Sequence, residues 1–244
     1  MLMTKVLIVL PMYNEENSIV STLIGLIPIC KDNSYDILVV DDGSEDFSFS
    51  VSKNFISTSK FPNIWLMRLP FNCGVGAAMR SGFTWAYSRN YTSVVQFDSD
   101  GQHDPMWISK LIEKSEEFDI VIGSRFQLSE KFTGSFRRLT MLILSKAIFL
   151  RTGFRISDPT SGFRLTNSRV IKVFANEYPT EYLGDTLNSL VVAHSYNFRV
   201  VETPVKMHKR IAGEPSAGLI KSALYLIRSI LSIALYQSPR GKNE

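Results

Sequence analysis

Short apolar runs alternate with segments of helical periodicity along the first half of the chain. The runs are typical of strands covered on both faces of a sheet, and they occupy Val6–Leu10, Ile37–Val40, Ile64–Leu69, Val94–Phe97 and Ile120–Ile122. Between them, apolar spacing predicts a helix from Glu15 to about Pro28, a second over Gly74–Ser88 and a third opened by Pro105. This alternation predicts an α/β fold with a parallel sheet of right-handed βαβ units.

A polar cluster follows each of these five predicted strands. The clusters are Tyr13–Glu15, Asp41–Asp42, Asn72–Gly76, Asp98–Asp104 and Ser124–Arg125. The carboxyl ends of parallel strands share one edge of a sheet, and ligands of open α/β sheets bind beyond that edge. We therefore expect the five clusters to form one site.

The second half of the chain is less regular. Arg138–Leu150 is an apolar stretch with helical character, a polar loop follows at Asp158–Arg164, and a further strand is expected near Phe198–Val201. No internal repeat or linker interrupts the chain, so we expect one catalytic domain over residues 1–216 and a helix with a tail over residues 217–244.

Residues 217–236 are mostly apolar with a narrow polar face that includes Lys221 and Arg228. A spanning helix needs about 20 mostly uncharged residues, so the two cations argue against one. The pattern predicts an amphipathic helix that lies in the membrane interface, with its cations among the headgroups. The alternative is a helix that packs on the core or on a second subunit.

Charge is distributed unevenly although the whole chain has a net charge of only +4. Residues 1–124 are net −6, whereas residues 125–155 are net +6 and residues 199–244 are net +5. Both basic stretches lie beside apolar helical patterns, which favours anionic lipid or phosphate as a partner over nucleic acid.

Composition excludes several classes of protein. Hydrophobic residues make up 45% and charged residues 20%, which is typical of a globular domain and excludes disorder and low-complexity scaffolds. The two cysteines, Cys30 and Cys73, lie in unrelated contexts. They indicate a reducing compartment and no disulfide framework.

The strongest chemical signal is Asp98-Ser99-Asp100-Gly101-Gln102, directly after a predicted buried strand. Oxygen-bearing side chains at alternate positions suit a hard divalent cation that keeps coordination sites for a substrate phosphate. Alone, the pattern also fits an ordinary Asp-rich turn. The second acidic pair, Asp41-Asp42, favours the cation, because mutually repelling carboxylates at one edge need an offsetting charge.

Six motifs together resemble family 2 glycosyltransferases, above all the branch of dolichol-phosphate mannose synthase and polyprenyl-phosphate glycosyltransferases. They are Pro11–Glu15, Val40–Ser44, Asn72–Gly76, Asp98–Pro105, Gly123–Arg125 and Asp158–Arg164. The likeness runs in order from about residue 5 to residue 216. It implies a GT-A fold with a mostly parallel sheet flanked by helices, a nucleotide-diphosphate sugar donor, Mg²⁺ or Mn²⁺, and inversion at the anomeric carbon.

The resemblance also implies roles for individual residues at the donor. The residues expected to bind the donor nucleotide are Pro11, Tyr13, Glu15, Val40, Asp42, Asp98 and Ser99. Asp98, Asp100 and Gln102 would bind the cation that offsets the negative charge developing on the diphosphate. Asp100 is thereby expected to take part in catalysis.

An acceptor phosphate needs cationic positioning more than a strong base, because it is already an anionic nucleophile. The residues expected to bind it are Arg125, Arg138, Arg210 and Ser216. The resemblance implies this role for the last two, which belong to a late Arg-x-x-Gly-x-x-Ser stretch of the resembling branch, and Pro215 departs from that branch's pattern. Asp158 is expected to orient the acceptor or to act as a base; the alternative is an Asp that caps a tight turn.

The expected function is transfer of a sugar from a nucleotide-diphosphate sugar to undecaprenyl or dolichyl phosphate for cell-surface glycan assembly. The enzyme is expected to be peripheral at the cytoplasmic face of a membrane, with or without a small membrane partner protein. One alternative is a family 2 enzyme that acts on a glycan hydroxyl. Another is a non-catalytic scaffold that binds nucleotide-sugar.

Overall fold

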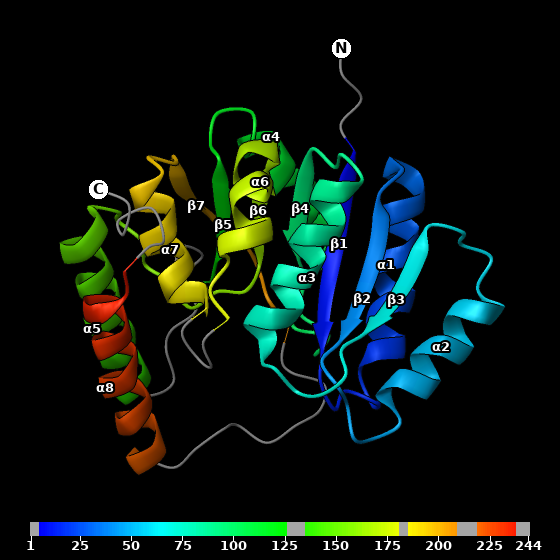
Figure 1. Ribbon diagram of the computed structural model, residues 1–244, viewed down its shortest axis with the longest axis horizontal. Helices are drawn as coiled ribbons and strands as arrows, with labels where there is room; N and C mark the ends of the chain where they lie inside the picture. Colours follow the sequence, from blue (N-terminus) through cyan, green and yellow to red (C-terminus); the bar gives the residue numbers. More distant parts are fainter. Residues whose placement is uncertain (1–4, 126–134, 181–184, 209–218, 238–244) are drawn as a thin grey trace.

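The computed structural model describes residues 5–125, 135–180, 185–208 and 219–237 (Figure 1). Within these residues one seven-stranded sheet forms, in the order β3-β2-β1-β4-β6-β5-β7. Its strands are β1 (Val6–Met12), β2 (Asp36–Asp41), β3 (Ile64–Arg68), β4 (Ser93–Gln96), β5 (Ile120–Ser124), β6 (Arg164–Asn167) and β7 (Val200–Pro204). β6 is antiparallel to both of its neighbours, and every other pairing is parallel. The predicted α/β fold with a mostly parallel sheet is confirmed.

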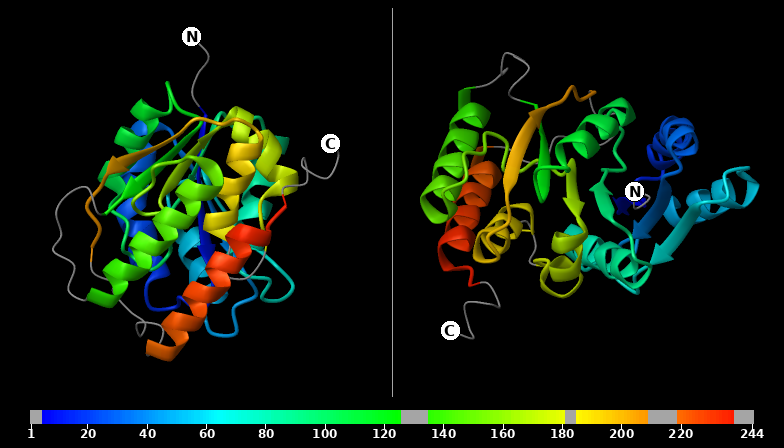
Figure 2. Two further views of the ribbon diagram at one scale, coloured as in Figure 1. Left: turned by 90° about the vertical axis from the view of Figure 1, so that its left-hand side faces the viewer. Right: turned by 90° about the horizontal axis from the view of Figure 1, so that it is seen from above.

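Helices cover both faces of this sheet, as Figure 2 shows from two further directions. They are α1 (Ile19–Asn33), α2 (Ser48–Thr58), α3 (Val75–Ser88), the 3₁₀ turn η1 (Pro105–Trp107), α4 (Ile108–Lys114), α5 (Ser135–Thr152), α6 (Ser168–Glu177), α7 (Asp185–Ser195) and α8 (Leu219–Leu235).

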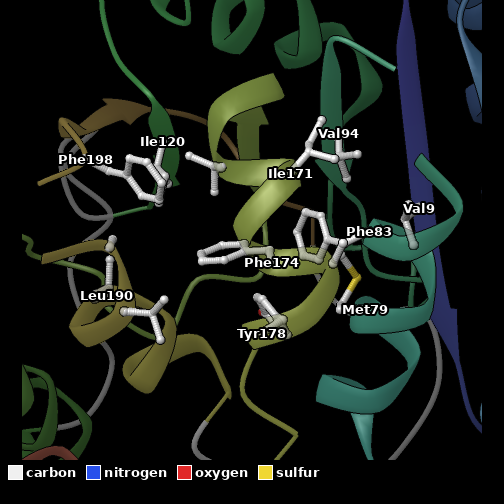
Figure 3. Packing of buried hydrophobic residues seen from close by; sticks show 14 of the residues in the cluster. Val9, Met79, Phe83, Val94, Ile120, Ile171, Phe174, Tyr178, Leu190 and Phe198 are labelled. Carbon is white, nitrogen blue, oxygen red and sulfur yellow. The ribbon is translucent and has the colours of Figure 1, made fainter. Parts of the chain in front are cut away.

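Alternate residues of the central strands pack into two separate cores. In β1, Leu7 and Val9 lie in the core under α3, α5, α6, α7 and α8, whereas Ile8 and Leu10 lie in the core under α1 and α4. Successive side chains of a strand point to opposite faces, so a strand covered on both sides must be apolar throughout. Figure 3 shows the first core, where Phe83 packs against aromatic residues that follow β6.

The arrangement of β6 keeps the predicted edge intact. β6 runs antiparallel to β4 and to β5, so β4 and β5 point the same way as β1, β2 and β3. Arg164 pairs with Gln96 and with Ile122, so β6 begins at the carboxyl edge of the other strands. The Asp158–Phe163 loop that precedes it therefore reaches the same edge as the five polar clusters.

The predicted bounds of the first helix were wrong at both ends, and the helix begins at Ile19 where Glu15 was expected. The helix expected to stop near Pro28 continues to Asn33. Pro28 and Ile24 are both exposed, so the carbonyl that loses its helical N–H partner lies on the solvent side of α1. The cost of proline there is smaller than in a buried helix interior.

Helices α5 and α8 lie side by side at one end of the molecule (Figure 1). α8 turns one face inward: Ile233 is 2% exposed in the core, and Ser232 Oγ accepts a 2.8 Å hydrogen bond from Asn188 of α7. This part of α8 therefore packs on the core, which was the alternative to a helix in the membrane interface. Its other face exposes Ile227, Leu231 and Leu235. Among the described helices, none combines the length and apolar character that crossing a bilayer requires.

Candidate active site

Asp42 joins the loops that follow β2 and β3. Its carboxylate is buried, and its two oxygens accept the N–H groups of Cys73 at 2.9 Å and Gly74 at 2.7 Å. Burial raises the pKa of Asp42 above its usual value, and the two N–H donors offset only part of that effect. Gly74 has a φ of +89°, a conformation open to glycine, which allows this turn before α3.

The other expected nucleotide-binding residues lie around the end of β1. The Pro11 carbonyl accepts a hydrogen bond from Ser99 Oγ at 2.9 Å, which ties β1 to the loop after β4. The Glu15 carboxylate accepts one from Ser18, and the Tyr13 side chain is exposed. Val40 has no exposed surface, so its side chain supports the strand from within the core and does not line the site.

The loop after β4 brings together the three residues expected to bind a cation. Asp100 is buried, and its carboxylate accepts the backbone N–H of Gln102 at 3.0 Å and the Gln102 side-chain amide at 2.6 Å. The Asp98 side chain is 36% exposed. A Cβ at Gly162 would lie 2.8 Å from both Asp98 carboxylate oxygens, so the absence of a side chain there makes room for them.

His103 is buried behind this loop and contacts Asp98. Its Nδ1 accepts the Asp98 backbone N–H at 3.0 Å, and its Nε2 lies 3.4 Å from Asp98 Oδ2. Burial lowers the pKa of His103 to about 4, although Asp100 and Asp158 act in the opposite direction. The imidazole is therefore neutral at physiological pH.

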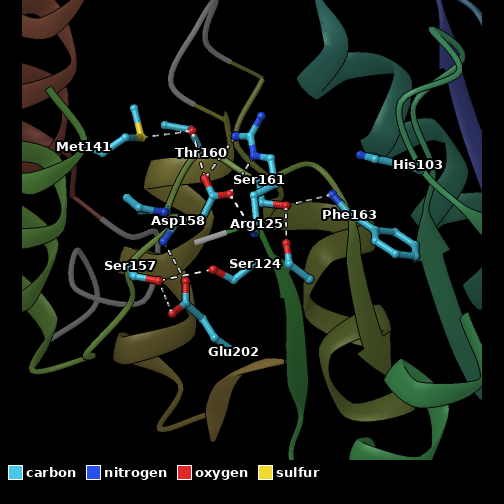
Figure 4. Close-up of polar contacts among 12 residues, drawn as sticks. His103, Ser124, Arg125, Met141, Ser157, Asp158, Thr160, Ser161, Phe163 and Glu202 are labelled. Carbon is cyan, nitrogen blue, oxygen red and sulfur yellow. Dashed lines mark hydrogen bonds and ion pairs between the residues drawn. The ribbon is translucent and has the colours of Figure 1, made fainter. Parts of the chain in front are cut away.

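Arg125 and Asp158 form a two-point ion pair beside the acidic loop (Figure 4). Arg125 Nε donates to Asp158 Oδ2 at 2.9 Å, and the Arg125 Nη2 group donates to Oδ1 at 3.1 Å. Asp158 is fully buried, whereas the Arg125 side chain remains 22% exposed. Burial lowers the pKa of Arg125, but Asp158, with smaller contributions from Asp98 and Asp100, outweighs it and the net shift is upward. The pair and the acidic loop thus form one electrostatic site.

Neighbouring elements hold the Asp158 loop in place. Glu202 of β7 accepts the Asp158 backbone N–H at 2.6 Å and the Ser157 hydroxyl at 2.8 Å (Figure 4). Thr160 Oγ1 donates to Asp158 Oδ1 at 3.3 Å and lies 3.6 Å from the sulfur of Met141 on α5. The loop therefore connects the carboxyl edge of the sheet to the inner face of α5.

The remaining predicted acceptor residues are not brought to this pair by any described contact. Arg138 is exposed near the start of α5. Arg210 and Ser216 lie outside the described residues. Arg164, the last residue of the Asp158–Arg164 motif, is buried and donates to the carbonyls of Pro159, Ser161 and Thr186 and to the Ser189 hydroxyl. Arg164 therefore joins the Asp158–Phe163 loop to α7 through these hydrogen bonds.

Sequence reasoning missed Asp185, the first residue of α7. Asp185 is 4% exposed, lies within contact of the position a Gly76 Cβ would occupy, and receives a 3.4 Å hydrogen bond from Tyr178. Burial raises its pKa, and Asp98 adds to the effect. The available signal was an acidic residue directly before an apolar helical stretch, which also fits a simple helix start.

A complete metal-holding group is not formed by protein side chains alone in the described part of the chain. No three histidine, cysteine, aspartate or glutamate side chains come together there in a suitable arrangement. The donors at the expected place are two carboxylates and the amide of Gln102.

These features define an α/β protein with an acidic loop and a paired arginine at the carboxyl edge of its sheet. The chain belongs to glycosyltransferase family 2, because the Glycosyl transferase family 2 profile matches residues 7–175.

Relatives of similar length cover most of the chain. It is 28% identical over 214 residues to a UDP-N-acetylglucosamine–dolichyl-phosphate N-acetylglucosaminyltransferase of Methanococcus voltae, with 82% of this chain and 84% of the relative covered. It is 27% identical over 225 residues to an undecaprenyl-phosphate mannosyltransferase of Micrococcus luteus, with 90% and 91% covered.

The fold is also found among solved structures. Glucosyl-3-phosphoglycerate synthase of Mycobacterium tuberculosis, crystallised with Mn²⁺, UDP and glucosyl-3-phosphoglycerate, superposes with a TM-score of 0.71 at 17% identity, covering 97% of this chain and 82% of that one. This likeness confirms the predicted GT-A fold.

Proposed function

We propose that the chain transfers a sugar from a nucleotide-diphosphate sugar to a polyprenyl phosphate at a membrane surface. An acceptor phosphate oxygen forms the new bond to the anomeric carbon, the bond from that carbon to the diphosphate breaks, and the electron pair leaves with the nucleoside diphosphate. The observation on which this rests is Arg125, a partly exposed cation held by buried Asp158 beside the acidic donor loop. Both named relatives act on a polyprenyl phosphate according to their names.

The acidic loop fits a divalent cation. Asp98 and Asp100 supply carboxylate oxygens and Gln102 supplies Oε1, since its amide nitrogen donates to Asp100. Mg²⁺ and Mn²⁺ prefer such oxygens and bind through one or two carboxylates together with substrate phosphates. A bound cation offsets the negative charge that the leaving diphosphate gains. The similar synthase crystallised with Mn²⁺ and UDP supports the same assignment.

The nucleotide lies, in this proposal, across the loops after β1 and β2. Asp42 sets the shape of this surface through its bonds to the loop after β3. Pro11, Tyr13 and Glu15 line it, with Ser99 joining the two loops below. Val40 contributes from the core as support for β2.

Arg125 binds the acceptor phosphate in this proposal, and Asp158 positions Arg125. Both Asp158 oxygens already accept hydrogen bonds from the guanidinium, so the carboxylate suits an orienting role better than proton removal. An ionised phosphate needs no base, which fits this division. A hydroxyl acceptor, by contrast, would need a base to remove its proton.

Membrane contact is proposed for the outer surface formed by α5 and α8, which we call the α5–α8 face. Its exposed apolar residues are Leu139, Leu142, Phe149, Leu150, Ile227, Leu231 and Leu235. Its exposed cations are Arg138, Lys146, Arg151 and Arg228. Exposed apolar side chains together with exposed cations match an interface of anionic lipid. The free thiols of Cys30 and Cys73 fit the cytoplasmic face.

The division at residues 216 and 217 remains a proposal about function. Residues 1–216 contain the catalytic machinery, and residues 217–244 add the membrane helix and tail. It does not separate two bodies, because Ile233 of α8 is buried in the common core.

The direct test is transfer of labelled sugar from a panel of UDP- and GDP-sugars into organic-extractable lipid, with undecaprenyl or dolichyl phosphate and Mn²⁺ present. Asp100→Asn is expected to abolish the labelled lipid. Asp104→Asn is the matched control: it makes the same change in the same loop, and asparagine can still cap η1 as Asp104 does. Donor turnover without lipid product would instead favour a glycan hydroxyl acceptor.

Membrane contact is tested by flotation with vesicles of phosphatidylglycerol and phosphatidylethanolamine. Leu231→Glu on the α5–α8 face should reduce binding at least about tenfold, because an exposed apolar group that would insert into the lipid is replaced by a charge that anionic lipid repels. Ile24→Glu is the control, because Ile24 is equally exposed on α1, at 58% against 53% for Leu231. Equal loss in both variants would contradict the assignment.

A further inference from the structure

The imidazole of His103 is clamped from several directions. The residue is 5% exposed, its ring stacks on Phe163 with centroids 4.8 Å apart, and the Phe97 ring lies edge-to-face with it at a centroid distance of 5.2 Å. Its backbone pairs with Met207, and the neighbouring Gln102 carbonyl accepts the His208 N–H at 2.7 Å. The ring and the backbone of His103 are both held in place, so each ring nitrogen points in one direction.

Both nitrogens face the same residue, Asp98. Nδ1 accepts the Asp98 N–H at 3.0 Å, so Nδ1 bears no hydrogen. An imidazole with no hydrogen on Nδ1 carries its hydrogen on Nε2, which lies 3.4 Å from Asp98 Oδ2. His103 thus presents an acceptor to the main chain of Asp98 and an N–H to its carboxylate.

The side chains of Asp98 and Asp100 are placed differently in this loop. Two groups of Gln102 already hold the Asp100 carboxylate, whereas the Asp98 side chain is partly exposed and faces the bare Cα of Gly162. A carboxylate that is oriented before a cation arrives loses less conformational freedom on binding, and the groups that orient metal ligands contribute strongly to affinity.

We propose that His103 is a positioning residue of the donor site, holding the main chain and the carboxylate of Asp98 in the geometry that receives the cation and the donor diphosphate. This inference rests on the proposed function for the ligand, and it adds a residue whose own atoms touch neither the cation nor the sugar.

The test distinguishes the contribution of ring packing from the contribution of the two ring nitrogens. His103→Phe keeps an aromatic ring against Phe163 and removes both nitrogens, whereas His103→Asn places an oxygen near the former Nδ1 and restores an acceptor for the Asp98 N–H. Binding of Mn²⁺ with UDP or GDP is measured by titration calorimetry, with no sugar transfer required.

His103→Phe is expected to weaken cation-dependent nucleotide binding by about 10-fold or more, and His103→Asn to recover most of that loss. His103→Phe binding as tightly as wild type would overturn the proposal, because His103 would then only fill space. If His103→Phe does not fold by circular dichroism, His103→Leu, which also removes both nitrogens, replaces it with the same expectation. Wild type that binds neither Mn²⁺ nor nucleotide would instead contradict the proposed function.

A second measurement needs no ligand. Long-range ¹H–¹⁵N correlation on the wild-type protein reports which ring nitrogen of His103 bears hydrogen. Hydrogen on Nε2 is expected. Hydrogen on Nδ1 would overturn the proposal, because Nδ1 is then unable to accept from Asp98.

Discussion

Arg125 and Asp158 form a two-point ion pair in which Nε and Nη2 of the arginine donate to the two oxygens of the aspartate at 2.9 and 3.1 Å. The carboxylate has no exposed surface, whereas part of the guanidinium does. The buried partner therefore fixes the direction in which the exposed one presents its charge, as expected of an arginine that binds a phosphate.

Asp158→Asn should impair both stability and transfer. The substitution leaves the largely buried Arg125 charge without its counter-charge, which costs about 3 kcal/mol in the free energy of unfolding. Urea unfolding and the transfer rate measure the two effects. The double variant Arg125→Met/Asp158→Leu should regain stability but not activity. An Asp158→Asn protein of normal stability with a shifted pH–rate profile would indicate a general base instead.

Gly162→Ala should weaken binding at the acidic loop. The new methyl would lie 2.8 Å from both Asp98 oxygens and 3.1 Å from Gln96 Nε2, so the Asp98 carboxylate must move. We expect a loss of about 1–3 kcal/mol of stability together with weaker Mn²⁺–nucleotide binding in calorimetry. Gly25→Ala in α1 is the control, because nothing lies within 4 Å of its Cβ position; it should stabilise the helix by up to about 1 kcal/mol. Unchanged binding in Gly162→Ala would contradict the close packing.

The two thiols should differ sharply in reactivity. Burial raises the pKa of Cys30 to about 12, so its thiol stays protonated and enclosed at pH 8. Cys73 is half-buried in the loop that Asp42 holds. A disulfide reagent such as DTNB should therefore modify one thiol quickly and the second only in denaturant. Cys73→Ser should remove the fast phase; a fast phase that persists would contradict the assignment.

Asp119 should make stability fall at acid pH. Burial opposes its ionisation, but the Arg199 N–H at 2.8 Å, the Asn167 amide at 2.9 Å and the charges of Arg169 and Arg199 outweigh it, so its pKa lies below the usual value. A carboxylate with a lowered folded pKa stabilises the protein above its unfolded pKa, about 3.9, and loses that contribution as pH falls through the folded value.

The measurement is urea unfolding of wild type and Asp119→Asn between pH 7 and pH 3. Wild type should be the more stable at pH 7, and the difference should shrink below about pH 4. Glu116→Gln, at an exposed position, should follow the wild-type curve. A difference that stays constant down to pH 3 would show that the Asp119 charge is not involved.

The sequence predicts much of this sheet because its strands are buried on both faces. Val6–Leu10 has no polar position, and the structure covers it with helices on either side. β6 escaped prediction because Arg164–Asn167 is a mixed, four-residue strand whose first residue is a buried arginine. Its pairing depends on two strands that are distant in sequence, and local pattern does not report on that.

At the site, the sequence predicts which loops meet but not which side chains hold each other. Asp158 and Arg125 are 33 positions apart, and nothing in the local spacing of either indicates their pairing. The role of Glu202 is not predictable from the sequence for the same reason. By itself Glu202 is a charged residue in a half-buried strand, and only the folded structure brings it to the Asp158 N–H. Asp185 reads as a helix start, and only its burial and its nearness to Asp98 mark it out.

The place of β6 between β4 and β5 has a consequence for how the chain is made. The ribosome releases β1 to β4 within the first 96 residues, yet the open edge of β4 finds its partner only after Asn167 has emerged. β5 also waits, since both of its neighbours come later in the chain. A nascent chain halted between residues 97 and 163 would present unpaired strand edges, which invite association with other chains. Synthesis of the last third of the protein is thus what completes the sheet that carries the loops of the candidate site.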